Sequence, residues 1–382
     1  MEAFLRLHRP SVRWACRSIT SSKTQGLPAM QRRDFLCGMA ATAIVGSTQT
    51  AWASDREKPF RVHQWQRHVQ NPVLPPGGGP FDVGCCMNPF VVVHGDDYFL
   101  FYAGADASGG RRICLATCPI DRVTGWKRHG PLFDRGGPGS FDETWCVLPC
   151  VHKFGEKWHM YYSSRSADKG VGLQGFRGIG LAISDDLRTW KKYSDEPVLL
   201  GDGFDDYQNN KGIAGGGPII EVPRSGGRTR YRMHYTLATG SPSTDLLTDQ
   251  AKLAVIAESD DGVTWIDRKI MLRPRLDAKY ENAAVIALNP WKTPTGWRAI
   301  YASIGTQFGA YSICEAASDD GIDWYRGKPG ENLAIAPTGN GWESKMVEYP
   351  HVVAEGNKLR LFYCGNGYGA TGIGTALAEQ LS

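Results

Sequence analysis

Short hydrophobic runs alternate with turns along the chain after residue 80. Paired runs joined by a Gly-containing turn recur as PFVVVHGDDYFLFYAG, PCVHKFGEKWHMYYSS and PHVVAEGNKLRLFYCG, and each pair is typical of a β-hairpin. A third run follows in each case, as in RRICLATC, GIGLAIS, KLAVIAES, SICEAAS and GIGTALA. The pattern therefore predicts an all-β chain of short strands.

These runs belong to a unit of roughly sixty residues that occurs five times. Each unit contains an acid, a Pro-led strand, a Tyr-rich strand and a turn that ends in Trp. The turns of the first four units end at Trp126, Trp190, Trp265 and Trp324, while the fifth unit stops before this turn. A period that holds four short strands predicts propeller blades. Because the Trp recurs in every copy, we expect it to serve the core of each blade.

The ring needs a closing strand, because the fifth unit ends after its third strand. Trp65 is a fifth Trp without an upstream partner, and its segment near residues 60–75 can supply the missing outer strand. Closure would remove an exposed sheet edge. The sequence thus predicts a five-bladed β-propeller closed by an N-terminal strand, with residues 54–382 as one domain.

Residues 1–53 have the order of a twin-arginine export signal. Arg32-Arg33 precede an apolar stretch, and Ala51-Trp52-Ala53 form a small-residue cleavage site. We expect an exported protein, periplasmic or extracellular. Met30 is a natural start, so residues 1–29 are either an upstream extension of the reading frame or part of an organelle transit peptide.

The leader also explains the basic balance of the chain. It holds seven of the 43 Lys and Arg but two of the 39 Asp and Glu, which leaves the remainder close to neutral. A nucleic acid or an anionic membrane is therefore not expected as a partner. No later apolar run is long enough to span a bilayer, and the oligomeric state is left open.

Eight of the ten cysteines follow the leader. The spacing of Cys114 with Cys118, and of Cys146 with Cys150, puts both sulfurs on one face of a strand. Such a pair can bind a metal or act as two small hydrophobes. The spacing matches no strong zinc signature, so we expect neither a metal nor another cofactor. Disulfides stay open.

Candidate chemistry comes from the acids near the start of each unit. An acid seven residues before the next strand's Pro repeats along the chain, as Asp82 with Pro89, Asp142 with Pro149 and Glu343 with Pro350, and Asp277 precedes Ala284 by the same step. A repeated turn acid often only binds backbone amides. Glu281 and Glu348, in contrast, are read as unique to their units.

Propeller inner strands converge on an axis, where acids from separate blades can cleave a glycosidic bond. The candidate catalytic residues are Asp82, Asp142, Glu281 and Glu348. The candidate substrate-binding residues are Asn88, Glu143, Trp145, Arg165, Arg177, Tyr349 and His351.

Through its SDDGxxW turns and acid-to-Pro openings, the chain resembles the five-bladed propeller superfamily of glycoside hydrolases, including families 32, 43, 62, 68, 117 and 130. The family 43 resemblance implies an Asp general base directly before the first-blade Pro, where this chain has Asn88. Leu148 and Gly217 stand at the next two such positions, while Glu348-Tyr349-Pro350 resembles the Glu-Gly-Pro motif of that family.

The resulting hypothesis is a glycoside hydrolase acting on an oligo- or polysaccharide. A sugar-binding propeller without catalysis is the alternative. A glycoside phosphorylase is a third interpretation, against which export and the lack of an evident Lys/Arg cluster at the blade openings count.

Overall fold

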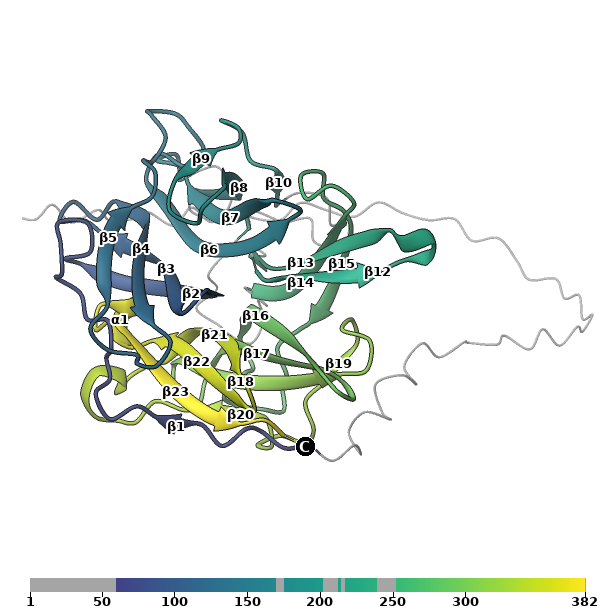
Figure 1. Cartoon of the computed structure of the whole chain (residues 1–382). Helices are drawn as coiled ribbons and strands as arrows, with labels where there is room; N and C mark the ends of the chain where they lie inside the picture. Colours follow the sequence, from purple (N-terminus) through teal and green to yellow (C-terminus); the bar gives the residue numbers. More distant parts are fainter. Residues whose placement is uncertain (1–59, 170–174, 202–211, 214–216, 239–251, 382) are drawn as a thin grey trace, which may run out of the picture. The chain divides into compact units, whose positions relative to one another are not determined.

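The computed structural model describes residues 60–169, 175–201, 212–213, 217–238 and 252–381. These residues form a five-bladed β-propeller, in which the sheets follow one another around a common centre (Figure 1). The expected leader over residues 1–53 lies outside the described residues. So does the segment around Phe204, where the sequence of the third repeat is longer than that of the other repeats.

The first two blades run from the innermost to the outermost strand in chain order, with antiparallel neighbours. Blade 1 consists of β2 (Cys85–His94), β3 (Asp97–Ala105), β4 (Arg111–Pro119) and β5 (Lys127–Pro131). Blade 2 consists of β6 (Trp145–Phe154), β7 (Lys157–Arg165), β8 (Phe176–Ser184) and β9 (Trp190–Lys192), with β10 (Leu199–Leu200) also on β8.

The next two blades repeat the order with interrupted edge strands. Blade 3 contains β11 (Gly212–Ile213) and β12 (Ile219–Pro223), both paired with β13 (Thr229–Ala238), then β14 (Lys252–Ser259) and β15 (Ile266–Leu272). Blade 4 contains β16 (Ala284–Thr293), β17 (Gly296–Gly305), β18 (Ala310–Ser318), β19 (Trp324–Tyr325) and β20 (Leu333–Ile335). Short 3-10 helices span Ser225–Gly227 and Gly341–Glu343.

Blade 5 joins the two ends of the described chain. Its strands are β21 (Glu348–Glu355), β22 (Lys358–Cys364), β23 (Ile373–Glu379) and, as the outermost, β1 (Gln66–Arg67), and α1 (Asn366–Gly369) lies between β22 and β23. His63 Nδ1 and Trp65 Nε1 both donate to the buried Glu315 carboxylate at 2.8 Å. The predicted N-terminal closure of the ring is therefore confirmed.

The recurrent Trp residues pack against the blade that precedes their own. Trp190 of blade 2 meets Phe101 of blade 1 edge-on at 5.8 Å, and Trp265 of blade 3 meets Tyr161 of blade 2 edge-on at 5.5 Å. Trp65 of blade 5 packs on a cluster that includes residues of blade 4. The expected packing role of these residues is confirmed, but they pack between two blades and not within the core of one.

The Ser-Asp turns before Trp190, Trp265 and Trp324 are held by their own side chains. In the third repeat, Asp261 accepts hydrogen bonds from the backbone amides of Val263 and Thr264 at 2.8 and 2.7 Å. Burial opposes ionisation of this carboxyl, but the amide hydrogen bonds prevail and lower its pKa to about 2. The repeated motif thus fixes the turn locally.

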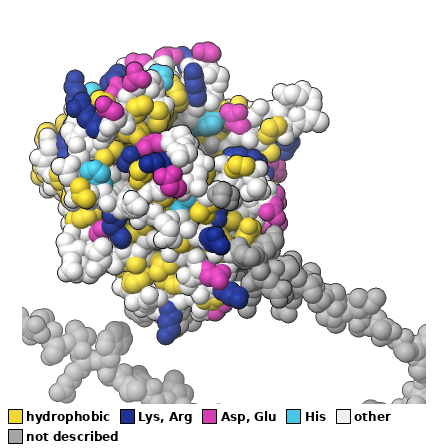
Figure 2. Space-filling view, turned by 60° about the horizontal axis from the view of Figure 1, so that its bottom comes forward, with side chains coloured by type: hydrophobic (Ala, Val, Ile, Leu, Met, Phe, Trp, Pro, Cys, Tyr) yellow, Lys and Arg dark blue, Asp and Glu magenta, His cyan; other side chains and the backbone are white. Residues whose placement is uncertain are grey.

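The eight cysteines of the described part are buried free thiols. Within the same part, no three His, Cys, Asp or Glu side chains are grouped to bind a metal ion. Nor is any helix there long and apolar enough to cross a bilayer. Figure 2 shows basic and acidic side chains interspersed on one face, without a broad patch of one sign.

Four of the inner strands have an irregularity at the same place near the axis. The register shifts there in β2, β6, β16 and β21. The residue at the shift has a positive φ of 54° in Asn88, 54° in Leu148, 53° in Ala287 and 51° in Tyr349. Together with Gly217, these residues line a narrow axial cavity of about 30 Å³. The axis is therefore nearly closed at this level.

Candidate active site at the axial end of the blades

Four of the blades contain the same buried latch between an acid and a tyrosine. The tyrosine stands twenty residues after the acid and donates its hydroxyl hydrogen to the carboxylate. The pairs are Asp82 with Tyr102 (2.9 Å), Asp142 with Tyr162 (3.1 Å), Glu281 with Tyr301 (2.6 Å) and Glu343 with Tyr363 (2.9 Å). Each carboxylate also forms an ion pair with one basic side chain. These pairs are Asp82 with Arg128, Asp142 with Lys192, Glu281 with Arg326 and Glu343 with Arg67.

The latch corrects one interpretation of the sequence. Glu281, not Asp277, is the repeated acid of blade 4, so it is not unique to its unit. Asp277 is partly exposed and pairs with Arg275 at 3.3 Å. Leu288 stands seven residues after Glu281, at the position where the other three latch repeats have Pro. Three of the four candidate catalytic acids, Asp82, Asp142 and Glu281, therefore hold strands together.

Glu348 occupies a different position. It begins β21 and directly precedes the positive-φ Tyr349, where the sister strands carry Met87, Val147 and Ile286. Its side chain is fully buried, and neither carboxylate oxygen has a hydrogen-bond partner among the described residues. A polar group at a hydrophobic position of the repeat serves no need of the blade.

The electrostatics of Glu348 favour the neutral carboxyl. Burial raises its pKa well above the usual range. The positive charges of Lys252 and Arg111, and the backbone amide of Tyr368, oppose that shift without cancelling it. Lys252 donates to the Tyr311 hydroxyl at 2.9 Å, and burial lowers the pKa of its own ammonium group. Such displaced pKa values are typical of functional sites.

Basic side chains also gather where blades 1 and 2 meet. The guanidinium carbons of Arg111 and Arg165 lie 3.9 and 4.2 Å from the centroid of the Trp145 ring. Trp145 and Arg165 line a pocket of about 270 Å³, together with Arg135 and Lys169. The sequence interpretation that the blade openings lack a Lys/Arg cluster is thus wrong, because residues distant in the sequence meet here.

The remaining candidates divide between the axis and the surface. His351 accepts from Asn289 and donates to the Val91 carbonyl, both at 3.0 Å, and burial lowers its pKa to about 4. Asn88 Oδ1 accepts from the Leu148 amide at 3.4 Å. These two residues hold neighbouring blades together around the axis.

Three further candidates differ in their surroundings. Tyr349 stands 6.0 Å from Tyr311, ring centroid to ring centroid. Glu143 accepts from the Gly139 amide at 3.0 Å, and the Arg177 side chain is exposed. Around Glu348 and Tyr349, the structure places Arg111, Lys252 and Tyr311. The sequence interpretation missed these last three residues.

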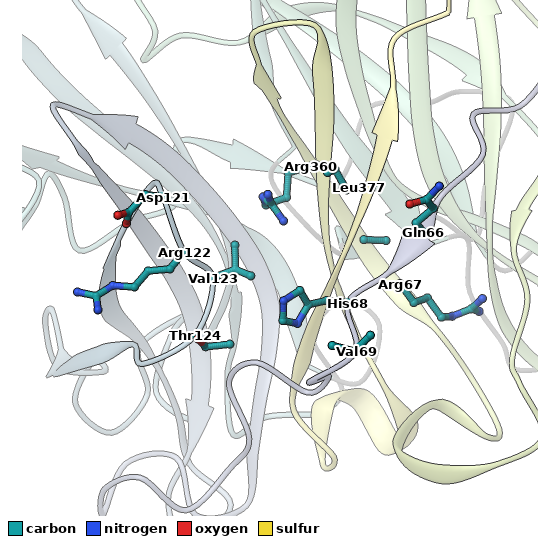
Figure 3. A pocket seen from close by; sticks show the side chains of 11 residues that line it. Gln66, Arg67, His68, Val69, Asp121, Arg122, Val123, Thr124, Arg360 and Leu377 are labelled. Atoms are coloured by element: carbon teal, nitrogen blue, oxygen red, sulfur yellow. The ribbon is translucent and has the colours of Figure 1, made fainter.

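A second pocket, of about 470 Å³, lies away from this cluster (Figure 3). Residues from β1 and from the turn at residues 121–124 line it, with His68 between them. Asp121 is its one acidic lining residue and none of its residues comes from an inner strand. This pocket belongs to the seam that closes the ring.

Known proteins share this architecture. A glycosyl hydrolase from Bacteroides ovatus aligns with a TM-score of 0.63 at 18% identity, covering 84% of this chain and 94% of its own. A structure of glycoside hydrolase family 130, described as a family of mannoside phosphorylases containing hydrolases of β-1,2-mannosidic linkages in Candida mannan, gives 0.62 at 17%, covering 85% and 98%. The chain has the fold of these carbohydrate-active proteins.

Other comparisons are less informative about activity. A β-1,2-mannobiose phosphorylase from Listeria innocua aligns with a TM-score of 0.60 at 14% identity, covering 82% of this chain and 96% of its own. Two uncharacterized Mycobacterium tuberculosis proteins are each 26% identical over 294 residues, or 75% of this chain and 90% of theirs. No family model matches the chain.

Proposed function

We propose that this chain cleaves a glycosidic bond of an oligosaccharide at the axial end, with Glu348 as the proton donor. The observation that carries this is the complete burial of a carboxyl that no side chain of the described part of the chain hydrogen-bonds, and that only the Tyr368 backbone amide approaches among the backbone donors acting on its pKa. Burial raises its pKa well above the usual range, so the carboxyl keeps its proton to higher pH than an ordinary glutamate does, as a general acid requires.

The chemistry assigned to Glu348 is a single proton transfer. Its carboxyl gives the proton to the glycosidic oxygen while the bond from that oxygen to the anomeric carbon breaks. A nucleophile then bonds to the anomeric carbon. Because the Glu348 side chain has no exposed surface, the side chains around it must move aside when a sugar binds.

Hydrolysis, with water as the nucleophile, is the first candidate. It agrees with the hydrolases among the structural neighbours. Water, however, needs a carboxylate to take up its proton. This requirement counts against hydrolysis, because the Asp82, Asp142 and Glu281 carboxylates are already bound in latches.

Phosphorolysis is the second candidate, and the positive charges of Arg111 and Lys252 favour it. Inorganic phosphate carries its own negative charge and needs no carboxylate base, while Arg111 and Lys252 offer positive charge beside Glu348. A β-1,2-mannobiose phosphorylase is also among the structural neighbours. The two candidates differ in their product, a free sugar or a sugar 1-phosphate.

The test uses the purified protein with β-1,2-mannobiose, other oligosaccharides and aryl glycosides, each with and without inorganic phosphate. We expect turnover that falls at least about 100-fold in Glu348→Gln. Glu379→Gln, the same change at an exposed glutamate, should keep full activity. Sugar binding without any product would instead establish the non-catalytic alternative, and full activity of Glu348→Gln would refute its role.

Export is part of the same proposal and depends on residues 1–53. Arg32-Arg33 before an apolar run supports a twin-arginine route to the periplasm or beyond. Fusion of residues 1–53 to a reporter should send the reporter out of the cytoplasm. Replacement of both arginines by lysine should retain it inside, and export of both fusions alike would contradict the assignment.

A further inference from the structure

Tyr368 has a backbone conformation that is unfavourable for tyrosine. It lies in α1, between Gly367 and Gly369, and all three residues are left-handed, with φ values of 65°, 58° and 78°. Glycine adopts this region freely, and asparagine adopts it more readily than an aromatic residue. The turn brings the Tyr368 backbone amide close to the Glu348 carboxyl, whose pKa it lowers against the larger effect of burial. This contact needs no aromatic side chain, so it does not explain why the residue is a tyrosine.

The surrounding contacts prevent this loop from relaxing. Asn366 Oδ1 accepts from the backbone amides of Lys345 and Met346 at 2.7 and 3.1 Å. A Cβ atom at Gly369 would lie 2.1 Å from the Cys86 carbonyl oxygen, so the loop passes close against β2. The backbone of Tyr368 is thus held in its strained conformation from both sides.

The Tyr368 ring is exposed beside the buried acid. Its relative exposure is 43%, and its centroid lies 5.9 Å from that of Tyr311 in an edge-on arrangement. Tyr311 in turn contacts Lys252 and Tyr349, the immediate neighbours of Glu348. Strain and exposure of an aromatic ring at one position indicate a role outside the packing of the blade.

We propose that Tyr368 binds the substrate by stacking its ring against the apolar face of a sugar, next to the bond that Glu348 cleaves. An aromatic ring offers a flat hydrophobic surface with a polar hydroxyl at its edge, which suits a pyranose. The left-handed backbone presents this ring at the rim, while Tyr311 supports its edge. This inference rests on the proposed function, because it assigns a contact in the same site.

The test is Tyr368→Asn, which removes the ring but tolerates a left-handed backbone. We expect its thermal unfolding midpoint to equal or exceed that of the wild type. For the oligosaccharide that the wild type cleaves, KM should rise about tenfold, equivalent to about 1.4 kcal/mol of binding, with kcat nearly unchanged. Tyr193→Asn, the same change at a 52% exposed tyrosine after β9, should alter neither parameter.

The possible outcomes separate this inference from the proposed function. A lower unfolding midpoint with unchanged KM would show that the ring is structural, and would overturn the inference. If the wild type cleaves no sugar, the proposed function fails. Calorimetry with β-1,2-mannobiose and the other oligosaccharides of the panel then tests the stacking role of Tyr368 by itself. Binding that weakens about tenfold in Tyr368→Asn would then support the stacking role, and equal or absent binding would overturn it.

Discussion

Replacing Glu348 by glutamine should make the protein more stable at alkaline pH. The two side chains have nearly the same shape, but glutamine never carries the charge that burial disfavours. In the wild type neither oxygen of Glu348 has a hydrogen-bond partner within the described residues. An ionised carboxylate there would be buried beside two cations without direct pairing.

The dependence on pH follows from the direction of the pKa shift. Below the usual pKa of glutamate, the carboxyl is protonated in both the folded and the unfolded chain, so burial adds no penalty related to ionisation. Above it, the unfolded chain ionises while the folded chain resists, because burial raises the pKa of Glu348 in the folded state. The wild type therefore loses stability as the pH rises, until the folded-state pKa is passed.

The size of the effect comes from this linkage, because glutamine leaves its polar atoms as unsatisfied as the neutral carboxyl does. Each pH unit over which the unfolded chain is ionised and the folded chain is not costs the wild type about 1.4 kcal/mol. We expect Glu348→Gln to exceed the wild type in free energy of unfolding by at least about 1.4 kcal/mol at pH 8, and by much less at pH 4.

Urea unfolding of the purified protein at pH 4 and pH 8 measures both differences. Glu379→Gln, at an exposed site, should show neither of them. A variant that is destabilised at pH 8, or a stability difference that does not change with pH, would refute the assignment of Glu348 as a buried acid with a raised pKa.

Three further predictions address activity, the latches and the closing seam. The turnover rate of the wild type should fall on the alkaline side as Glu348 loses its proton, since burial raises its pKa; a rate profile that rises through this range would contradict its role as the acid. Tyr363→Phe removes the hydroxyl that donates to Glu343, so it should lower the free energy of unfolding by about 1–3 kcal/mol with kcat/KM unchanged, and a selective loss of kcat would show that the latch serves catalysis. Trp65→Ala removes both a contact with Glu315 and packing at the blade 4–5 interface, and should lower the free energy of unfolding by about 3–5 kcal/mol; an unchanged urea midpoint would contradict the role of the N-terminal strand in closure.

The fold could be predicted because each repeat carries its own local signals. The Trp at the end of each turn and the unpartnered Trp65 indicate both the number of blades and the closing segment. These features depend on strands that are neighbours in the sequence, or on a repeat that can be counted.

The catalytic candidates were harder to separate, since the fourth repeat lacks the Pro that marks the step. Aligning Asp277 with Ala284 shifted the repeat by four residues and made Glu281 look unique. The tyrosine of the latch could have corrected this, because counting back twenty residues from Tyr301 reaches Glu281.

Other features of the site are not visible in the sequence at all. Arg111 begins β4, Lys252 begins β14 and Glu348 begins β21, each in a different blade. Their proximity depends on how the blades are arranged around the axis. The left-handed backbone of Tyr368 likewise depends on contacts with β2 and with residues 341–346.

Leaving-group dependence tests the role of Glu348 most directly. A 2,4-dinitrophenyl glycoside of the sugar that the protein accepts departs without protonation, whereas the natural oligosaccharide needs an acid. Glu348→Gln should therefore lose at least about 100-fold in rate on the oligosaccharide, while keeping most of its rate on the dinitrophenyl glycoside. An equal loss on both substrates, or no loss on either, would contradict the assignment of Glu348 as the proton donor.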